Sequence, residues 1–347
     1  MKPSDKIIEC VANISLGHQG AALETIKSAI SQLGGQKLLD VDSSPSANRS
    51  VLTFAGQPQA VAEAAFEMYK AASELIDMRY HQGSHPRIGA IDVCPLVPLQ
   101  NISKKEVLQL ANELAAKVGY LLHIPVYLYE FSARKSYRCE LPQIRKGGYE
   151  NLPFKMAKAN WQPDFGPAID SEFRENIYRS GASVIGCRKI LVAFNISIDT
   201  KSVAIAKKIA YRIRSSGWPE KVARSPEETC LTYPALRAIG WYSDDYGCAQ
   251  VSCNFINHKK TRPITVWETV KALAQEYGCA AIGCEVIGLI PEICLLDAGL
   301  FATRQSRQLA LLQREDFIHL GAEHLKLNAV RPFDPNQKIL EYRLKEL

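Results

Sequence analysis

The sequence predicts an α/β (α+β) protein made of two ferredoxin-like subdomains, each with the element order β-α-β-β-α-β. The first half of the chain alternates strand-like and helix-like segments in this order, and the second half repeats it. Residues 132–180, rich in Lys, Arg, Tyr and Pro, connect the halves. A ferredoxin-like unit places its helices on one face of a mostly antiparallel sheet and leaves the other face open. We expect the open faces to cover each other, to meet a partner subunit, or to hold a ligand in a cleft between the halves.

The elements of the first half follow from its hydrophobic periodicity. Apolar residues that alternate with polar ones predict strands, and apolar residues three or four positions apart predict helices. Strands are expected at residues 7–15, 37–43, 49–56, 90–99 and 125–131. Helices are expected at 19–33, at 58–76 with Pro58 near the start, and after the capping box Ser103–Glu106.

The second half shows the same signals in the same order. Strands are expected at residues 187–198, 236–243, 248–257 and 280–291, with helices at 205–213 and after the capping box Thr265–Glu268. A helix near 301–313 and short strands at 323–330 and 338–344 would form a C-terminal extension. The predicted domains are therefore residues 1–180, 181–300 and 301–347.

The composition is typical of a globular protein of the reducing cytosol, and its mild positive charge fits small anionic substrates as well as other acidic partners. The chain has 347 residues, more than one core usually serves, with 47% hydrophobic and 22% charged residues. We see neither a signal peptide nor an apolar run of about 18 residues, so we expect no membrane span. The ten cysteines form no C-x-x-C pair, which is typical of free thiols in a reducing compartment. The net charge of +6 is spread along the chain without a nucleic-acid-binding motif.

One short loop concentrates residues that can carry chemistry. His81 and His85 lie on either side of Gly83, and Pro86 and Arg87 follow. Gly83 allows a sharp turn, and Pro86 restricts His85 to an extended backbone. Histidine suits proton transfer near neutral pH, and arginine suits a carboxylate. Alternatively, both histidines bond backbone carbonyls in a rigid loop; a two-histidine metal site is disfavoured because no third ligand lies nearby.

Two further sites lie at the ends of predicted strands. Leu39 and Val41 should point to the core, so Asp40 and Asp42 share the opposite face, where Asp42 could stabilise a developing cation. The alternative is that Asp42 caps the following loop. Asn13, at the end of the first strand, can donate and accept hydrogen bonds to a substrate or cap a turn. Neither a P-loop nor a G-x-G-x-x-G motif is present.

Nine segments together resemble the glutamate formimidoyltransferase family. They are IIECVANIS, LLDVDSSPSANRSV, IDMRYHQGSHPRIGAIDVCPLVP, PVYLYE, PDFGP, KILVAFNI, IGWY, AQVSCN and VIGLIP. The resemblance covers residues 6 to about 345 and agrees with the two-subdomain fold. Because the chain is too short for a cyclodeaminase domain, it looks like the stand-alone transferase.

This resemblance implies transfer of the formimidoyl group from N-formimidoyl-L-glutamate to N5 of tetrahydrofolate. The products are L-glutamate and 5-formimidoyltetrahydrofolate, in histidine degradation. It also implies a cytoplasmic homodimer with tetrahydrofolate as co-substrate and without a metal. The family's catalytic histidine lies in an H-P-R motif that matches His85. Its folate-contacting segment follows D-F-G-P, which matches the region from Gly166 and Pro167 to Gly181.

The proposed chemistry assigns a role to each candidate residue. His85 takes the proton of N5 as it attacks the amidine carbon and later protonates the departing glutamate nitrogen. Asp42 stabilises the positive amidine centre. The expected substrate-binding residues are Arg87, Asn13, Asn48 and His81.

Near this site the sequence departs from the family pattern. The usual proline before Asn13 is Ala12, two usual acidic residues are Leu16 and Ser84, and the segment at 168–180 is longer. These changes leave two alternatives open. One is a folate-linked transferase that uses N-formyl-glutamate, and the other is a non-catalytic folate-binding homologue.

Overall fold

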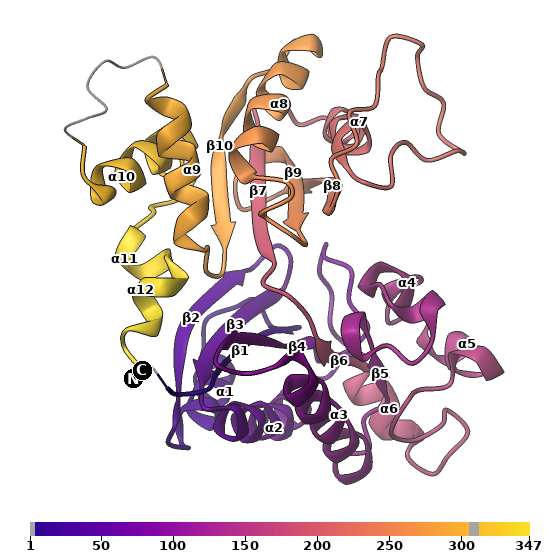
Figure 1. Ribbon diagram of the computed structural model, residues 1–347. Coiled ribbons are helices and arrows are strands. Elements are labelled where there is room, and N and C mark those ends of the chain that lie inside the picture. The colour runs from indigo at the N-terminus through magenta and orange to yellow at the C-terminus, as the bar shows by residue number, and fades with distance from the viewer. Residues whose placement is uncertain (1–3, 305–311) are drawn as a thin grey trace. The chain divides into compact units, whose positions relative to one another are not determined.

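Two β-sheets organise the chain, one in each half (Figure 1). The first sheet has six strands in the order β2-β3-β1-β4-β6-β5, and the second has four in the order β10-β7-β9-β8. The computed structural model describes residues 4–304 and 312–347. The chain divides into two units, Met1–Lys189 and Ile190–Glu346, which we call unit 1 and unit 2.

Unit 1 contains the predicted ferredoxin-like core. Its elements in order are β1 (Ile7–Ile14), α1 (Ala21–Ser31), β2 (Gln36–Ser44), β3 (Arg49–Gly56), α2 (Pro58–Leu75), β4 (Ile91–Gln100), α3 (Lys104–Leu121), β5 (Val126–Leu128) and β6 (Ser183–Cys187). The strands β2-β3-β1-β4 pair antiparallel, which confirms the β-α-β-β-α-β order. Both β4 and β5 pair with β6 in parallel.

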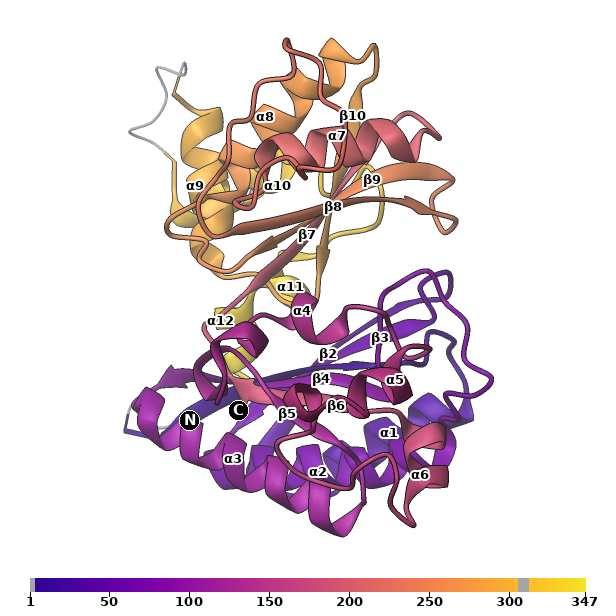
Figure 2. The same cartoon turned by 90° about the vertical axis from the view of Figure 1, so that its right-hand side faces the viewer.

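The helix boundaries in unit 1 follow from capping and proline. Pro58 occupies the first turn of α2, where its missing N–H costs nothing. The Ser103 side chain accepts from the Glu106 N–H, and the Glu106 carboxylate accepts from the Ser103 N–H, so the predicted capping box is confirmed. Helices α1–α3 cover one face of the sheet (Figure 2), where a row of strand residues packs beneath them. That row includes Ile8, Cys10, Ala12, Ile14, Leu52 and Phe54.

The segment after β5 covers part of the opposite face of the same sheet (Figure 2). It contains η1 (Glu130–Ser132), η2 (Ser136–Arg138), α4 (Leu141–Arg145), α5 (Leu152–Met156), η3 (Ala159–Trp161) and α6 (Arg174–Ser180). Val93 and Val184 of the sheet pack against Ile144, Leu152 and Met156 of this segment. The segment is therefore part of the unit 1 core as well as a connection. Arg138 and Asp164 form an ion pair of 2.8 Å within it, with side chains only 2% and 4% exposed.

Unit 2 repeats the ferredoxin-like arrangement, as predicted. Its elements are β7 (Val192–Ile198), α7 (Val203–Ile213), β8 (Leu236–Ser243), β9 (Cys248–Phe255), α8 (Pro263–Glu276) and β10 (Ala281–Ile287). All neighbouring strands are antiparallel. Phe194, Val251 and Phe255 pack with Trp267 of α8 in its core.

The connection between the units differs from the sequence prediction. The strand expected at 187–198 begins only at Val192, as β7, and an additional strand that was not expected, β6, ends at Cys187 and belongs to the other sheet. Residues 183–187 lie after the predicted boundary at 180, yet they pair with β4 and β5. The division after Lys189 therefore leaves β6 in unit 1.

The C-terminal part is helical, so the two strands expected there are wrong. It contains α9 (Glu292–Ala302), α10 (Arg314–His324), α11 (Pro335–Lys338) and α12 (Leu340–Leu344). Leu325 and Leu327 are both buried and look like strand alternation, but they lie in the turns after α10. Ile339 makes one bridge to Ile290, and α12 follows it. The helix expected near 301–313 falls mainly on residues 305–311, which lie outside the described residues.

The buried ion pair of unit 1 gives a test of the fold. Asp164→Ala should lower the free energy of unfolding by about 3–5 kcal/mol, because it leaves the Arg138 guanidinium buried without its carboxylate. Urea denaturation measures this change. The control is Glu63→Ala, which removes an exposed ion pair with Lys117 and should cost at most about 1 kcal/mol. Equal losses in the two variants would contradict the assignment.

Candidate active site

Three loops of unit 1 meet at one edge of its sheet. They are residues 15–20 after β1, residues 45–48 between β2 and β3, and residues 76–90 between α2 and β4. The strands β2, β3, β1 and β4 are antiparallel neighbours. The end of β1, the β2–β3 connection and the start of β4 therefore fall on the same side. This edge is where most of the predicted site residues lie.

Asn48 fastens the three loops together. Its Oδ1 accepts from the backbone N–H of Gly17 at 2.9 Å, and its Nδ2 donates to the carbonyl of Gln82 at 2.8 Å. Its φ of 45° is left-handed, a conformation that asparagine tolerates better than most residues. Both ends of the side-chain amide therefore have protein partners, and Asn48 shapes the loops around the site.

Gly83 serves a close approach between two of these loops. A Cβ added at this position would lie 2.4 Å from the carbonyl oxygen of Ala47. Ser84 continues the contact, because its Oγ donates to the carbonyl of Ser46 at 3.1 Å. The glycine was expected to allow a turn between the histidines, and the structure gives it this additional reason.

His85 faces a guanidinium group. Its Nε2 contacts Nη1 of Arg49, and its Nδ1 is buried without a hydrogen-bond partner among the described residues. Burial, followed by the charges of Arg49 and Arg145, holds the pKa of His85 well below its ordinary value. Because a guanidinium can only donate, Nε2 accepts and the proton of the neutral ring is assigned to Nδ1. His85 is thus a neutral imidazole at pH 7, the state that a general base needs.

His81 has a different environment, in which both ring nitrogens are used. Its Nε2 lies 2.9 Å from the carbonyl of Asn48, and its Nδ1 accepts from Nε of Arg87 at 3.1 Å. The accepting Nδ1 places the ring proton on Nε2, which donates to the carbonyl. Burial lowers the pKa of His81 and favours this neutral form. The alternative of a histidine bonded to a backbone carbonyl therefore describes His81, but not His85.

Arg87 already holds a carboxylate of the protein. Its Nη2 and Nη1 donate to the two oxygens of Glu150 at 2.7 and 3.1 Å. The side chain of Arg87 is only 14% exposed, whereas that of Glu150 is 65% exposed. The hydrogen bond from Arg87 lowers the pKa of Glu150. Arg87 was expected to bind a carboxylate, and in this structure the carboxylate is that of Glu150.

Asp92 and Arg145 form a second ion pair close to the loop of His85. Asp92, 2% exposed, accepts from the backbone N–H of Ile88 through Oδ1 at 2.9 Å and from Arg145 Nη2 through Oδ2. This pair ties α4 to the start of β4. It also fixes the position of the Arg145 charge that acts on His85.

Asp42 and Asn13 lie in one row across the sheet. Asp42 is opposite Val51, and Val51 is opposite Asn13. Their neighbours Val41 and Ala12 belong to the helix-covered face, so Asp42 and Asn13 share the other face. Asp40 alternates with Val41 and so lies on that face with Asp42, as predicted, while the register shift between Leu38 and Asp40 leaves Leu38, in place of the expected Leu39, against the helix-covered core. Asp42 is buried, 5% exposed.

The predicted folate-contacting residues pack where parallel strands begin. Gly166, with φ 89°, lies against the carbonyl of Ile124 just before β5, and the half-buried Pro167 follows it. Gly181, with φ 69°, precedes β6 and bridges Gly89 after the loop of His85. Because β4, β5 and β6 are parallel, all of these positions lie at one edge of the sheet.

Four residues beside the histidines were missed by the sequence analysis. They are Arg49, Asp92, Arg145 and Glu150. Arg49 directly follows Asn48 in the quoted motif, which is a signal that could have been used. The other three are typical surface charges by pattern, and only the tertiary fold brings them to the loop.

The part of the chain that the structure describes contains no group of three or more His, Cys, Asp or Glu residues arranged to hold a metal ion. The ten cysteines are all free thiols. None of the helices in residues 4–304 and 312–347 combines the length and apolarity needed to cross a bilayer.

Unit 2 also has polar groups on the sheet face opposite its helices. Glu285, 6% exposed, accepts from the hydroxyl of Tyr246 at 2.5 Å and from Nδ2 of Asn195 at 3.3 Å. Gln250 and Trp241 are opposite each other on β9 and β8, and Oε1 of the first and Nε1 of the second have no described partner. This face offers both a donor and an acceptor.

Comparisons with known proteins give one family for both units. The model of the formiminotransferase domain, N-terminal subdomain, matches residues 7–188, and the model of the formiminotransferase domain matches residues 193–345. The chain is 39% identical over 312 residues to the glutamate formimidoyltransferase of Streptococcus pyogenes serotype M1, covering 90% of this chain and 95% of that protein. It is 36% identical over 295 residues to the enzyme of the same name from Thermoplasma acidophilum, covering 84% and 91%.

Longer relatives match over only part of their length. The formimidoyltransferase-cyclodeaminase of Rattus norvegicus is 40% identical over 338 residues, covering 97% of this chain and 60% of that protein. The chain therefore spans about 60% of the length of these relatives.

The environment of His85 predicts its titration. The ring should titrate well below pH 6.5, and Arg49→Ala should raise its pKa because one repelling charge is lost. NMR titration of the histidine ring signals measures both values. Lys201→Ala, which removes a positive charge from unit 2, is the control and should leave the pKa unchanged. An ordinary pKa for His85 in the unmutated protein would contradict the structure.

The same shift has a consequence for stability. Below about pH 6.5 the unfolded chain binds a proton that folded His85 does not bind, so the free energy of unfolding should fall as the pH decreases. His85→Gln should reduce this fall. Urea denaturation at a series of pH values measures it, and an unchanged pH dependence in the variant would argue against a lowered pKa.

Proposed function

This chain belongs to the formiminotransferase family, and from that premise we propose that it transfers the formimidoyl group of N-formimidoyl-L-glutamate to N5 of tetrahydrofolate. The products are L-glutamate and 5-formimidoyltetrahydrofolate, as in histidine degradation. The observation that carries the proposal is the match over almost the whole length of relatives named glutamate formimidoyltransferase. The neutral imidazole of His85 supports it.

His85 is the proposed general acid and base. N5 attacks the amidine carbon, and its proton passes to Nε2 of His85 once Arg49 has released that nitrogen. The positive charges of Arg49 and Arg145 make the protonated ring a stronger acid than an ordinary imidazolium. It therefore gives the proton readily to the nitrogen of the departing glutamate. Holding both substrates in place would contribute several kcal/mol more to the rate, on the order of the known proximity effects.

Asp42 and Asn13 are the proposed substrate contacts on the open face of the sheet. Asp42 stabilises the positive charge of the amidine, and the Asn13 amide orients the donor. The strand register supports this assignment because it puts both residues in one row.

His81, Asn48 and Arg87 keep their proposed place in substrate binding, with roles that follow from their contacts. His81 and Asn48 hold the loop that carries His85. Arg87 releases the carboxylate of Glu150, whose exposed side chain can move away, and binds a substrate carboxylate in its place. Tetrahydrofolate, as co-substrate, contacts the region of Gly166, Pro167 and Gly181. We propose that the protein works as a homodimer in the cytoplasm.

The departures from the family pattern are accommodated locally. Ala12 is fully buried beneath the helices. Leu16 packs against the same core, and its carbonyl accepts from Ser50 Oγ at 2.5 Å. Ser84 bonds to the carbonyl of Ser46. These contacts show that the fold accommodates all three departures. The following test also distinguishes the two alternatives, a transferase that uses N-formyl-glutamate as donor and a homologue that binds folate without turnover.

A direct assay tests the proposal. The purified protein should form 5-formimidoyltetrahydrofolate from formimidoyl-glutamate and tetrahydrofolate, followed by ultraviolet absorbance after acid conversion. His85→Ala should lower kcat about 10²–10⁴-fold, the usual contribution of a general acid or base. His319→Ala, an exposed histidine of α10, is the control. Turnover with N-formyl-glutamate alone, or folate binding without turnover, would replace the proposal, and full activity of His85→Ala would overturn the role of His85.

The role of Asp42 has its own matched control on the same strand. Asp42→Asn should lower kcat at least about tenfold, because the neutral amide no longer stabilises a cationic centre. Asp40→Asn removes a charge from the same face and should leave kcat nearly unchanged. Circular dichroism checks that both variants are folded. Equal kcat values for the two variants would remove Asp42 from the mechanism.

A further inference from the structure

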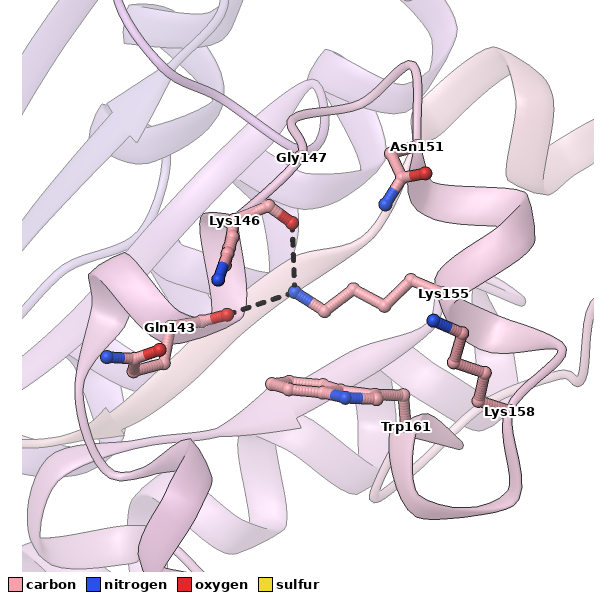
Figure 3. Close-up of a pocket in the computed structure, with 7 residues that line it drawn as sticks. All are labelled: Gln143, Lys146, Gly147, Asn151, Lys155, Lys158 and Trp161. Carbon is pink, nitrogen blue, oxygen red and sulfur yellow. Dashed lines mark hydrogen bonds between the residues drawn. The ribbon is translucent and has the colours of Figure 1, made fainter. Parts of the chain in front are cut away.

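A cavity of about 520 Å³ lies in the segment that covers unit 1. Figure 3 shows its lining residues, with Lys155 extending over the ring of Trp161 toward the carbonyls of Gln143 and Lys146. Its lining residues are Gln143, Lys146, Gly147, Asn151, Lys155, Lys158 and Trp161. Three of these residues carry a positive charge, and none carries a negative one. His85 is not among the residues that line it, and none of the lining residues was given a role in the function proposed above.

Lys155 is a fixed cation in the wall of this cavity. Its Nζ donates to the carbonyls of Gln143, Ile144 and Lys146 at 3.0, 2.5 and 3.2 Å. It also lies 4.0 Å from the ring centroid of Trp161, a cation–π contact. An ammonium group has three N–H donors, so all of them are used. The side chain cannot easily leave this position, and its charge stays at the cavity.

The positive charges around the cavity are not neutralised by the protein. Lys146 and Lys158 are exposed, and in the described part of the chain neither side chain has an acidic partner. Burial, together with the charges of Lys146 and Lys158, lowers the pKa of Lys155 to about 8. The nearby carboxylate of Glu150 is bonded to Arg87. A bound anion would relieve this repulsion.

We propose that this cavity is a binding site for an oxyanion, the carboxylate or phosphate group of a small molecule. Lys146 and Lys158 close on the anion from the rim, while Lys155 supplies a fixed charge from the wall. The amides of Gln143 and Asn151 add hydrogen-bond donors. The aromatic face of Trp161 offers contact area for the carbon atoms of the ligand.

The anion has two possible sources. Gln143 of helix α4 and Lys146, which follows the helix, line the cavity, and Arg145 at the end of α4 pairs with Asp92 beside the loop of His85. A carboxylate at the acidic end of a substrate could therefore occupy the cavity, and this version rests on the proposed function. Alternatively, the occupant is free phosphate or a phosphorylated metabolite. Both occupants present the same kind of anionic group, but only the substrate carboxylate would make the KM depend on the cavity.

Binding is tested without turnover, so this test is independent of the proposed function. Isothermal titration of inorganic phosphate and of glutarate into the purified chain should show one site for each. The double variant Lys146→Ala/Lys158→Ala should weaken both at least tenfold. The control Lys201→Ala/Lys221→Ala removes the same charge from exposed positions in unit 2 and should bind as the unmutated protein does. Absent binding, or equal weakening in both double variants, would overturn the proposal.

Kinetics then separate the two sources. If a substrate carboxylate occupies the cavity, Lys146→Ala/Lys158→Ala should raise the KM for that substrate about tenfold with kcat unchanged, and phosphate should compete with it. If free phosphate is the occupant, the double variant should lose phosphate binding and keep its KM. A chain without transferase activity that still binds phosphate would reject the proposed function and support the anion site.

Discussion

The neutral imidazole of His85, placed against the guanidinium of Arg49 and within the field of Arg145, is the interaction on which the rest of this account depends. An imidazolium at this position would add a third positive charge where burial already disfavours charge. The fold therefore keeps an unprotonated nitrogen in place at pH 7. A base of this kind is weak, but its protonated form is a strong acid. The transfer of one amidine between two nitrogens uses both properties, because a proton must be taken up and returned.

The environment of His85 requires three loops to keep their positions. Asn48 joins them through its side-chain amide, and Gly83 lets two of them touch. Arg87 and Glu150 complete the support from the segment that follows β5. The three loops come from different parts of the chain, but the ferredoxin-like order brings them to one edge of the sheet. The same segment, residues 130–180, contributes Arg145 to the site and encloses the lysine-lined cavity. It thus joins the chemistry of His85 to a place suited for an anion.

Local sequence signals were sufficient for the order of elements. Strand alternation, Pro58 and the Ser103–Glu106 capping box each act within a few residues, and the structure confirms them. The same signals failed where pairing between distant segments decides which residues form a strand. The sequence predicted one strand from 187 to 198, whereas β7 begins at Val192, and the strand β6 at Ser183–Cys187, which pairs with β4 and β5, was missed. A strand was wrongly expected at 323–330 because the buried Leu325 and Leu327 mimic strand alternation, although they lie in the turns after α10. Arg49 and Arg145 lie far from His85 in sequence, so their effect on its charge could not be read from the pattern.

The pH dependence of kcat/KM for the transferase tests the central claim most directly. If His85 acts as a base with a lowered pKa, the midpoint of the acidic limb should lie well below pH 6.5. Replacing Arg49 by alanine should shift this midpoint to a higher pH. This limb reports the free enzyme, in which the charges around His85 are those of the structure. An acidic limb at or above pH 6.5, unmoved by the loss of Arg49, would contradict the account.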